Sequence, residues 1–503
     1  MATSIISRGS DTLDVFARRS TPKIEINLQG QKPGLVNSYT TGDYIEGTAN
    51  ITVDQETRFD EIEIILQGTS HTTVERAACP GRTGSQQMFL KLRQPIEDAE
   101  YPTPRIMEAG HTYSFSFTFV VPNHLLPQVC SHTKQNDHIH RSHTMLPPTL
   151  GDPMAVSDAK TLINDMSPEM SQISYIVSVS VLKRAPHHSS KTLANVAKKV
   201  RIIPIVEEEP PLNTVDHTSY CTRKEKTVKR GFLRGKQGQL VASGLQPKPI
   251  ALLPPSCETH DTVSTVAKVQ LRFDPVGDEQ PPRLGSMTTK IRASTFYSAN
   301  PWEDFPCQSG TSVSQVGQGL YTDSIPLSNM CVASAKWEKH SIHDRRDSVN
   351  STSSTSSDSS DDSTGPSASF TGDTFYTASL VIPVSLPKSK TFVPTFHSCL
   401  MSRTYSLDWS LSYHTPGANV MTPSISLRLP IQVTTQPRFA EPTKSDLGLV
   451  VTQEELNEFF HPRSTSPRSL GLASTDSTVD LTAPPEYSEA MSRPRRRRVP
   501  ATQ

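Results

Sequence analysis

The chain has 503 residues, a length that suggests roughly three domains, although all-β domains can run to about 200 residues each. Its hydrophobic fraction of 34% is below that of an average globular chain, so part of it is expected to lie outside any packed core. The formal net charge is zero, which argues against a general nucleic-acid binder, because such proteins gain affinity by neutralising phosphates.

The cysteines and the N-terminus point to an intracellular protein. The 7 cysteines are scattered without CxxC pairs, which favours reduced thiols over a disulfide framework. Residues 1–20 contain no apolar stretch of the kind that a secretory signal needs, and no run of about 18 apolar residues occurs anywhere. We therefore expect a soluble, cytoplasmic protein, and no cofactor.

Apolar residues alternate with polar ones along many short segments, the period of half-buried strands. The clearest segment is 113–121, where Tyr113, Phe115, Phe117 and Phe119 share one face, and a stripe of this kind usually belongs to a core. Strands are predicted at 23–29, 45–53, 62–66, 113–121, 173–182, 200–206, 269–273, 291–295, 379–384, 407–413 and 425–433. No long segment of helical period interrupts them, so the prediction is an all-β chain of two consecutive immunoglobulin-like β-sandwich domains.

Changes in residue composition along the chain indicate where the domains begin and end. Residues 347–364 consist almost wholly of Ser, Thr, Asp and Asn and cannot bury enough apolar area to offset the entropy of ordering. The predicted organisation is a disordered N-terminus (1–20), a first sandwich (21–206), a linker (207–221), a second sandwich (222–437) with a disordered insert (about 344–370), and a disordered tail (438–503).

Two segments could suggest a binding site. The segment 124–143 holds five histidines and a cysteine, but their spacing matches no zinc finger or His-Glu-x-x-His helix, and flanking prolines favour a loop, so no metal is predicted. The glycines of 229–238 fit neither phosphate-binding pattern, and a hairpin is favoured there. The six residues of the first segment are His124, Cys130, His132, His138, His140 and His143.

The tail contains the motif Ala483-Pro484-Pro485-Glu486-Tyr487-Ser488. The two prolines favour an extended polyproline II turn, which aromatic grooves bind at little entropic cost, and the tyrosine can fill a second pocket. Pro-Pro-x-Tyr is the ligand pattern of WW domains, and Pro484, Pro485 and Tyr487 are the predicted contacts. The basic run Arg495–Arg498 could serve anionic lipid, nuclear import or neither.

The two sandwiches followed by Pro-Pro-x-Tyr resemble the α-arrestin family of trafficking adaptors, and its fungal members in particular. The resemblance covers about residues 21–435 and the motif at 484–487. The segments that carry it are 42–47, 59–68, 113–122, 146–151, 229–238 and 394–405. A single Pro-Pro-x-Tyr is present where such adaptors often have two or more, and the sequence reveals neither a polar core of the visual-arrestin kind nor a phosphate-sensing lysine pair.

The resemblance implies an adaptor rather than an enzyme. Its body would engage membrane transporters or receptors, and its motif would recruit a WW-domain HECT-type ligase that attaches ubiquitin to the cargo and promotes endocytosis. Such a protein would associate peripherally with the plasma membrane or endosomes. The adaptor itself is expected to be ubiquitinated, with Lys191, Lys198 and Lys199 as candidate acceptors.

Hydroxyls near paired arginines are candidate phosphorylation sites. Ser348 follows Arg345-Arg346 at the spacing that basophilic kinases favour, and Ser20 and Ser466 have similar contexts. Phosphate at these positions could create a docking site for a 14-3-3 protein.

Three other functions are weighed. An enzyme is disfavoured because no GxSxG elbow, Walker loop, zincin helix or paired carboxylates stand out. A cargo-sorting scaffold of the same fold, which recruits no ligase, is the main alternative. A DNA-binding sandwich that uses Arg495–Arg498 is disfavoured by the zero net charge, and no nucleic-acid partner is predicted.

Overall fold

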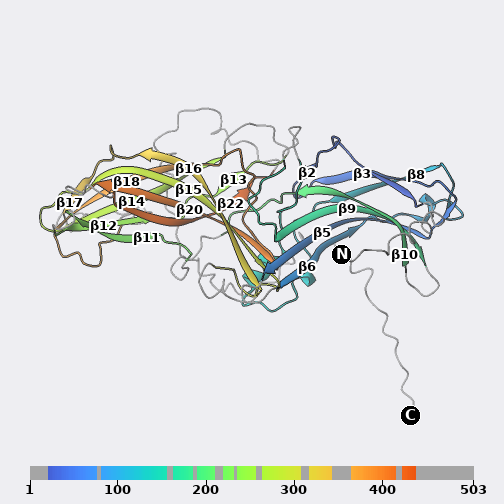
Figure 1. The fold of residues 1–503 in the computed structure, drawn as a ribbon, viewed down its shortest axis with the longest axis horizontal. Coiled ribbons are helices and arrows are strands. Elements are labelled where there is room, and N and C mark those ends of the chain that lie inside the picture. Colours follow the sequence, from blue (N-terminus) through green and yellow to red (C-terminus); the bar gives the residue numbers. More distant parts are fainter. Residues whose placement is uncertain are drawn as a thin grey trace, which may run out of the picture.

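A computed structural model describes most of the chain and confirms an all-β fold. The described residues are 21–75, 81–155, 162–184, 190–209, 219–230, 235–255, 263–307, 317–341, 364–414 and 422–437. The predicted N-terminal segment 1–20 and tail 438–503 lie outside them. The described residues form two β-sandwiches that lie end to end along the long axis of the molecule (Figure 1). No helix among them is long and apolar enough to cross a membrane.

The first sandwich packs a three-stranded sheet against a five-stranded sheet. The smaller sheet has the order β1 (Lys23–Leu28), β3 (Tyr44–Thr52), β8 (Thr112–Val120). The larger has the order β2 (Ser38–Tyr39), β10 (Ser190–Ile202), β9 (Ser171–Arg184), β5 (Glu61–Glu75), β6 (Arg82–Arg93). The short elements are β4 (Thr57–Arg58), which pairs with β7 (Ile106–Met107), the 3-10 helices η1 (Asp98–Glu100) and η2 (Pro127–Cys130), and the helix α2 (Asp137–Thr144).

The second sandwich consists of two larger sheets. One has the order β11 (Arg223–Lys229), β12 (Lys236–Gly244), β14 (Ser264–Pro275), β18 (Thr374–Ser385), β17 (Glu338–Ser341). The other has the order β16 (Gln318–Cys331), β15 (Arg283–Ser298), β20 (Met401–His414), β19 (Phe396–His397), with β21 (Ser424–Ile431) also paired with β20. A parallel pair, β13 (Ile250–Leu252) with β22 (Val433–Thr435), completes the domain.

The aromatic stripe of β8 shows how the alternating pattern folds the chain. Phe115, Phe117 and Phe119 are buried in the core of the first sandwich, and Tyr113 packs at its edge. The intervening Ser114, Ser116 and Thr118 face outward, as the period of a strand requires. The prediction that this stripe is core is confirmed.

Glycine is required where β3 approaches its neighbours closely. A Cβ on Gly47 would lie 2.4 Å from the Asn27 carbonyl oxygen of β1 and 2.6 Å from the Phe117 ring of β8. Only the absence of a side chain lets both neighbours pack against this point of the sheet. The turn before β3 uses Gly42 at a positive φ of 82°, which is a backbone conformation that glycine adopts without strain.

Several elements differ from the sequence expectations. The region after residue 88, where the alternation weakens, continues strand β6, whose side chains are mostly half-buried or exposed. The segment 124–143, expected to be a loop, contains the helix α2, so that prediction is wrong in part. The strands β11 and β12 pair antiparallel on either side of residues 231–234, as expected for a hairpin.

The end of the Ser/Asp-rich insert is packed on the second sandwich. The buried Asp274 carboxylate accepts a hydrogen bond from the Ser367 amide at 2.7 Å and one from Arg272 Nε at 2.7 Å. The Arg272 guanidinium also lies over the Phe370 ring, 5.0 Å from its centroid. The packed chain therefore resumes at Thr364, earlier than expected, and residues 342–363, which include the first part of the insert, lie outside the described residues.

The two sandwiches share their apolar cores. The cluster that fills the first domain includes residues of the second, and Met166 of the first domain packs in the cluster of the second. The residues that the second domain contributes are Tyr297, Ala299, Val393, Phe396 and Met401. This exchange makes the domain interface an extension of both cores rather than a loose surface contact.

A buried arginine ties the domains together at this interface. Arg403, on β20, is fully buried, and its guanidinium donates hydrogen bonds to the carbonyls of Asp165 at 2.9 Å and Met166 at 3.2 Å in the first domain. The loop that presents these carbonyls is held in turn by the Asp165 carboxylate, which accepts from the Gly151 amide at 2.6 Å. Nearby, the Thr391 amide donates to the Asn164 carbonyl at 2.9 Å.

We expect Arg403→Ala to lower the free energy of unfolding by about 3 kcal/mol or more, because it leaves the carbonyls of Asp165 and the buried Met166 without their donor and opens a cavity. The control Arg82→Ala removes an exposed arginine paired with Glu75 at 2.8 Å and is expected to cost less than about 1 kcal/mol. Denaturant midpoints of the full chain measure both. Equal midpoints for the two variants would contradict an anchoring role for Arg403.

Candidate functional site at the domain interface

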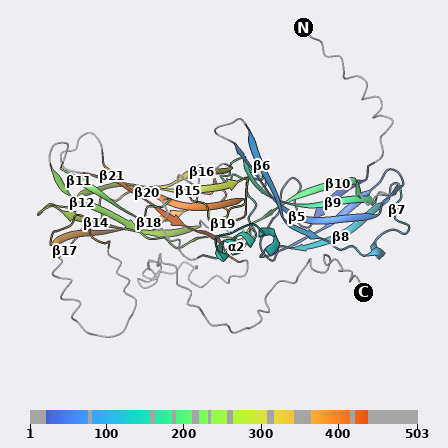
Figure 2. The same ribbon diagram turned by 90° about the horizontal axis from the view of Figure 1, so that it is seen from below.

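A short helical segment of the first domain forms one side of the candidate site. Helix η2 ends at Cys130, and α2 begins after Asn136, whose side-chain oxygen accepts from the Ile139 amide at 3.1 Å. This is the usual cap of a helix start. The inner face of α2 buries Ile139 and, in its last turn, His143. Figure 2 shows α2 between the two sandwiches, and it contacts β19 of the second domain.

The opposite side of the site is the turn between β19 and β20. The Ser398 amide donates to the Met401 carbonyl at 2.7 Å, which closes a tight turn with Cys399 inside it. The Cys399 carbonyl accepts from the Trp302 amide at 2.8 Å, so the turn is also held from a neighbouring loop. Cys399 is buried and directed toward the helical segment.

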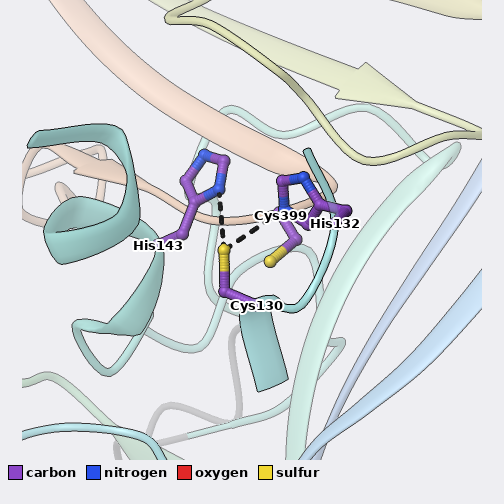
Figure 3. A group of neighbouring side chains, drawn as sticks. All are labelled: Cys130, His132, His143 and Cys399. Atoms are coloured by element: carbon purple, nitrogen blue, oxygen red, sulfur yellow. Dashed lines mark hydrogen bonds between the residues drawn. The ribbon is translucent and has the colours of Figure 1, made fainter. Parts of the chain in front are cut away.

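Four side chains from these two domains converge, as Figure 3 shows: Cys130, His132, His143 and Cys399. One nitrogen or sulfur atom of each lies within 4.8 Å of those of the other three. Cys130 Sγ lies 3.3 Å from His132 Nε2 and 3.6 Å from His143 Nδ1. We call these four residues the Cys/His cluster.

The neighbours of the cluster fix the orientation of one imidazole. His132 Nδ1 lies 2.9 Å from the Thr133 carbonyl, and because a carbonyl only accepts, this nitrogen carries the proton. The lone pair of His132 is therefore on Nε2, the atom that faces Cys130. The Cys130 carbonyl accepts from Lys134 Nζ at 2.6 Å, which holds the backbone of the turn in place.

Burial favours the neutral forms of two cluster members, His143 and Cys399. It lowers the pKa of His143 to about 3, with smaller contributions from His132 and His397. Burial also raises the pKa of the Cys399 thiol to about 12, and the adjacent Cys130 adds to the effect. The Cys399 thiol is therefore protonated and poorly nucleophilic near neutral pH.

The structure brings together three of the six residues noted in the segment 124–143 and leaves the other three elsewhere. His138 contacts the Phe305 ring at a centroid distance of 5.1 Å, and its Nε2 lies 3.9 Å from Glu209 Oε2. His124 forms a backbone bridge with Met145. His140 is half-buried on α2 and does not belong to the cluster. The fourth member, Cys399, comes from the segment 394–405.

The other predicted site residues separate into two groups. Six of them lie outside the described residues: Pro484, Pro485, Tyr487, Ser348, Ser20 and Ser466. The lysines Lys191, Lys198 and Lys199 all lie on β10. Lys198 Nζ donates to the Ile26 carbonyl at 2.7 Å, and Lys199 Nζ pairs with Asp152 Oδ1 at 2.5 Å. Lys191 is exposed near the start of the strand.

Comparison with known proteins gives one partial match. No protein-family model matches the chain. The chain is 25% identical over 168 residues to Bypass of stop codon protein 5 of Saccharomyces cerevisiae, a match that covers 27% of this chain and 32% of the yeast protein. The match thus covers about a third of that relative's length.

We expect Cys399 to react with iodoacetamide more than about 100-fold more slowly than the exposed Cys331 at pH 8. Burial raises the pKa of the Cys399 thiol to about 12, so little of it is in the reactive thiolate form at pH 8, and burial also limits access by the reagent. Mass spectrometry of the native protein measures both rates. The two rates should converge in denaturant, and similar rates in the native protein would contradict the buried geometry.

Proposed function

We propose that this protein is an arrestin-like adaptor that recruits a WW-domain HECT-type ubiquitin ligase to membrane transporters or receptors. The observation that carries the proposal is the combination of two β-sandwiches in one chain with a Pro-Pro-x-Tyr motif at 484–487. The partial likeness to an arrestin-related yeast protein supports the same class. Neither the cluster nor the strands favour a catalytic role, which agrees with an adaptor.

In this proposal the folded body binds the cargo and the tail binds the ligase. The shared apolar core and the Arg403 anchor give the body one stable surface with which to bind a cytosolic face of the cargo. The composition of residues 438–503 predicts an unpacked tail, which holds the ligase near the cargo without fixing its position. Two weak contacts in one chain then reinforce each other through effective concentration.

We expect Tyr487→Ala to weaken binding of the full-length protein to WW domains by at least about tenfold, since an aromatic anchor of this kind typically contributes about 2 kcal/mol or more. The matched control is Glu486→Ala at the variable position of the motif, which should retain binding. Biolayer interferometry against a panel of HECT-ligase WW domains measures the affinities. If the wild-type chain binds no WW domain, a cargo-sorting scaffold that recruits no ligase replaces the proposal.

Among the three candidate acceptors, Lys191 should carry more ubiquitin than Lys198 or Lys199. Transfer of ubiquitin requires a free amine, and the amines of Lys198 and Lys199 are held by a carbonyl and a carboxylate, respectively, although the Lys199 side chain is 44% exposed. We expect Lys191→Arg to lower the modification of β10 more than Lys198→Arg or Lys199→Arg does. Mass spectrometry of Gly-Gly remnants after reaction with a bound ligase tests this order. Equal occupancy of the three lysines would contradict it.

A further inference from the structure

We propose that Cys130, His132, His143 and Cys399 bind one zinc ion that joins the two β-sandwiches. Three ligands come from the helical segment of the first domain, and the fourth comes from the β19–β20 turn of the second. The inference is independent of the proposed adaptor function, because it rests on the geometry of the body alone.

The distances fit a single tetrahedral ion. Zinc–sulfur bonds of about 2.3 Å and zinc–nitrogen bonds of about 2.0–2.1 Å place the ligand atoms of a tetrahedral site about 3.3–3.8 Å apart. The cluster shows 3.3 Å and 3.6 Å for the two sulfur–nitrogen pairs of Cys130, and no pair of ligand atoms exceeds 4.8 Å. The remaining pairs of ligand atoms, which lie at up to 4.8 Å, would shorten toward these values when the ion binds.

The donor types select the metal. Two thiolates and two imidazoles in a tetrahedral arrangement are typical of structural zinc sites, whereas magnesium and calcium prefer oxygen ligands. Two thiolates would also balance the charge of the ion, so the filled site is neutral, which suits its buried position. Four protein ligands leave no open position for a substrate, so the role is structural rather than catalytic.

The surroundings resemble a metal site beyond the four ligands. The Thr133 carbonyl accepts from His132 Nδ1, an outer contact that orients a ligating imidazole and leaves its other nitrogen free for the metal. His143 is held on the capped helix α2, and Cys399 is held in a turn closed by backbone hydrogen bonds. These ligands are therefore already positioned on regular structure, which lowers the cost of organising the site.

The site would link elements that the chain brings together only on folding. Cys399 lies four residues before Arg403 in the same hairpin, so the ion and the arginine anchor would hold one element of the second domain against the first at two points. Loss of zinc would leave the arginine contact and the shared core in place but loosen the α2 side of the interface. Zinc binding and domain docking are thus coupled.

The test uses the full-length protein expressed in zinc-supplemented medium and purified under reducing conditions. Elemental analysis should find one zinc ion per chain in the wild type. Replacing it with cobalt(II) should give the thiolate charge-transfer and d–d absorption bands of a tetrahedral site. Cys399→Ser and Cys130→Ser should each lose more than about 100-fold in zinc affinity, because changes in outer contacts alone cost about 10–100-fold. The matched control Cys331→Ser alters an exposed thiol outside the cluster and should retain zinc and the cobalt spectrum.

Thermal unfolding distinguishes loss of zinc binding from failure to fold. Zinc added to the chelator-treated wild type should raise the unfolding temperature, and Cys399→Ser should fold by circular dichroism but show no such rise. Three results would overturn the proposal: a wild-type chain without stoichiometric zinc or the cobalt spectrum, zinc retained by Cys399→Ser, or a disulfide between Cys130 and Cys399 in protein alkylated at the moment of cell lysis.

Discussion

The guanidinium of Arg403 is the interaction on which the arrangement of the two sandwiches depends. A fully buried charge of this kind is stable only when its surroundings replace the hydrogen bonds of water, and here two carbonyls of the first domain do so. Burial lowers the pKa of the neighbouring Arg201 to about 10, and Asp165 opposes this effect. Separating the domains would therefore leave buried polar groups without partners, which makes their docking specific rather than merely hydrophobic.

One hairpin of the second domain carries this constraint and the Cys/His cluster together. The β19–β20 turn presents Cys399, and the first residues of β20 present Met401 to the first core and Arg403 to the Asp165 loop. Each contact holds the same backbone against a different element of the first domain. Since the three lie so close in sequence, a change at one of them is expected to alter the others, and their effects on stability should not be additive.

The strands could be predicted where one face is apolar, because alternation reports burial directly. The segments 113–121 and 407–413 are confirmed as strands with buried faces. Strand β6 (Arg82–Arg93) is not predicted, because residues such as Gln86 lie outside the core and its first half shows no alternation of apolar and polar residues. The prolines around this segment favour a loop, but they lie before and after helix α2 and not within it. The capping residue Asn136 was the signal that could have located the start of the helix. Apolar alternation thus predicts the strands that pack one face in a core, and it does not predict strands whose side chains stay mostly exposed.

The Cys/His cluster could not be derived from spacing, because its fourth member is supplied by tertiary structure. Within 124–143 the sequence offers one cysteine and several histidines at no known interval, and this by itself favours a loop. The second thiol arrives only when the domains dock, at a position that α2 and the β19–β20 turn define jointly. A site assembled in this way reports on the docked state itself, since its ligands are complete only in that state.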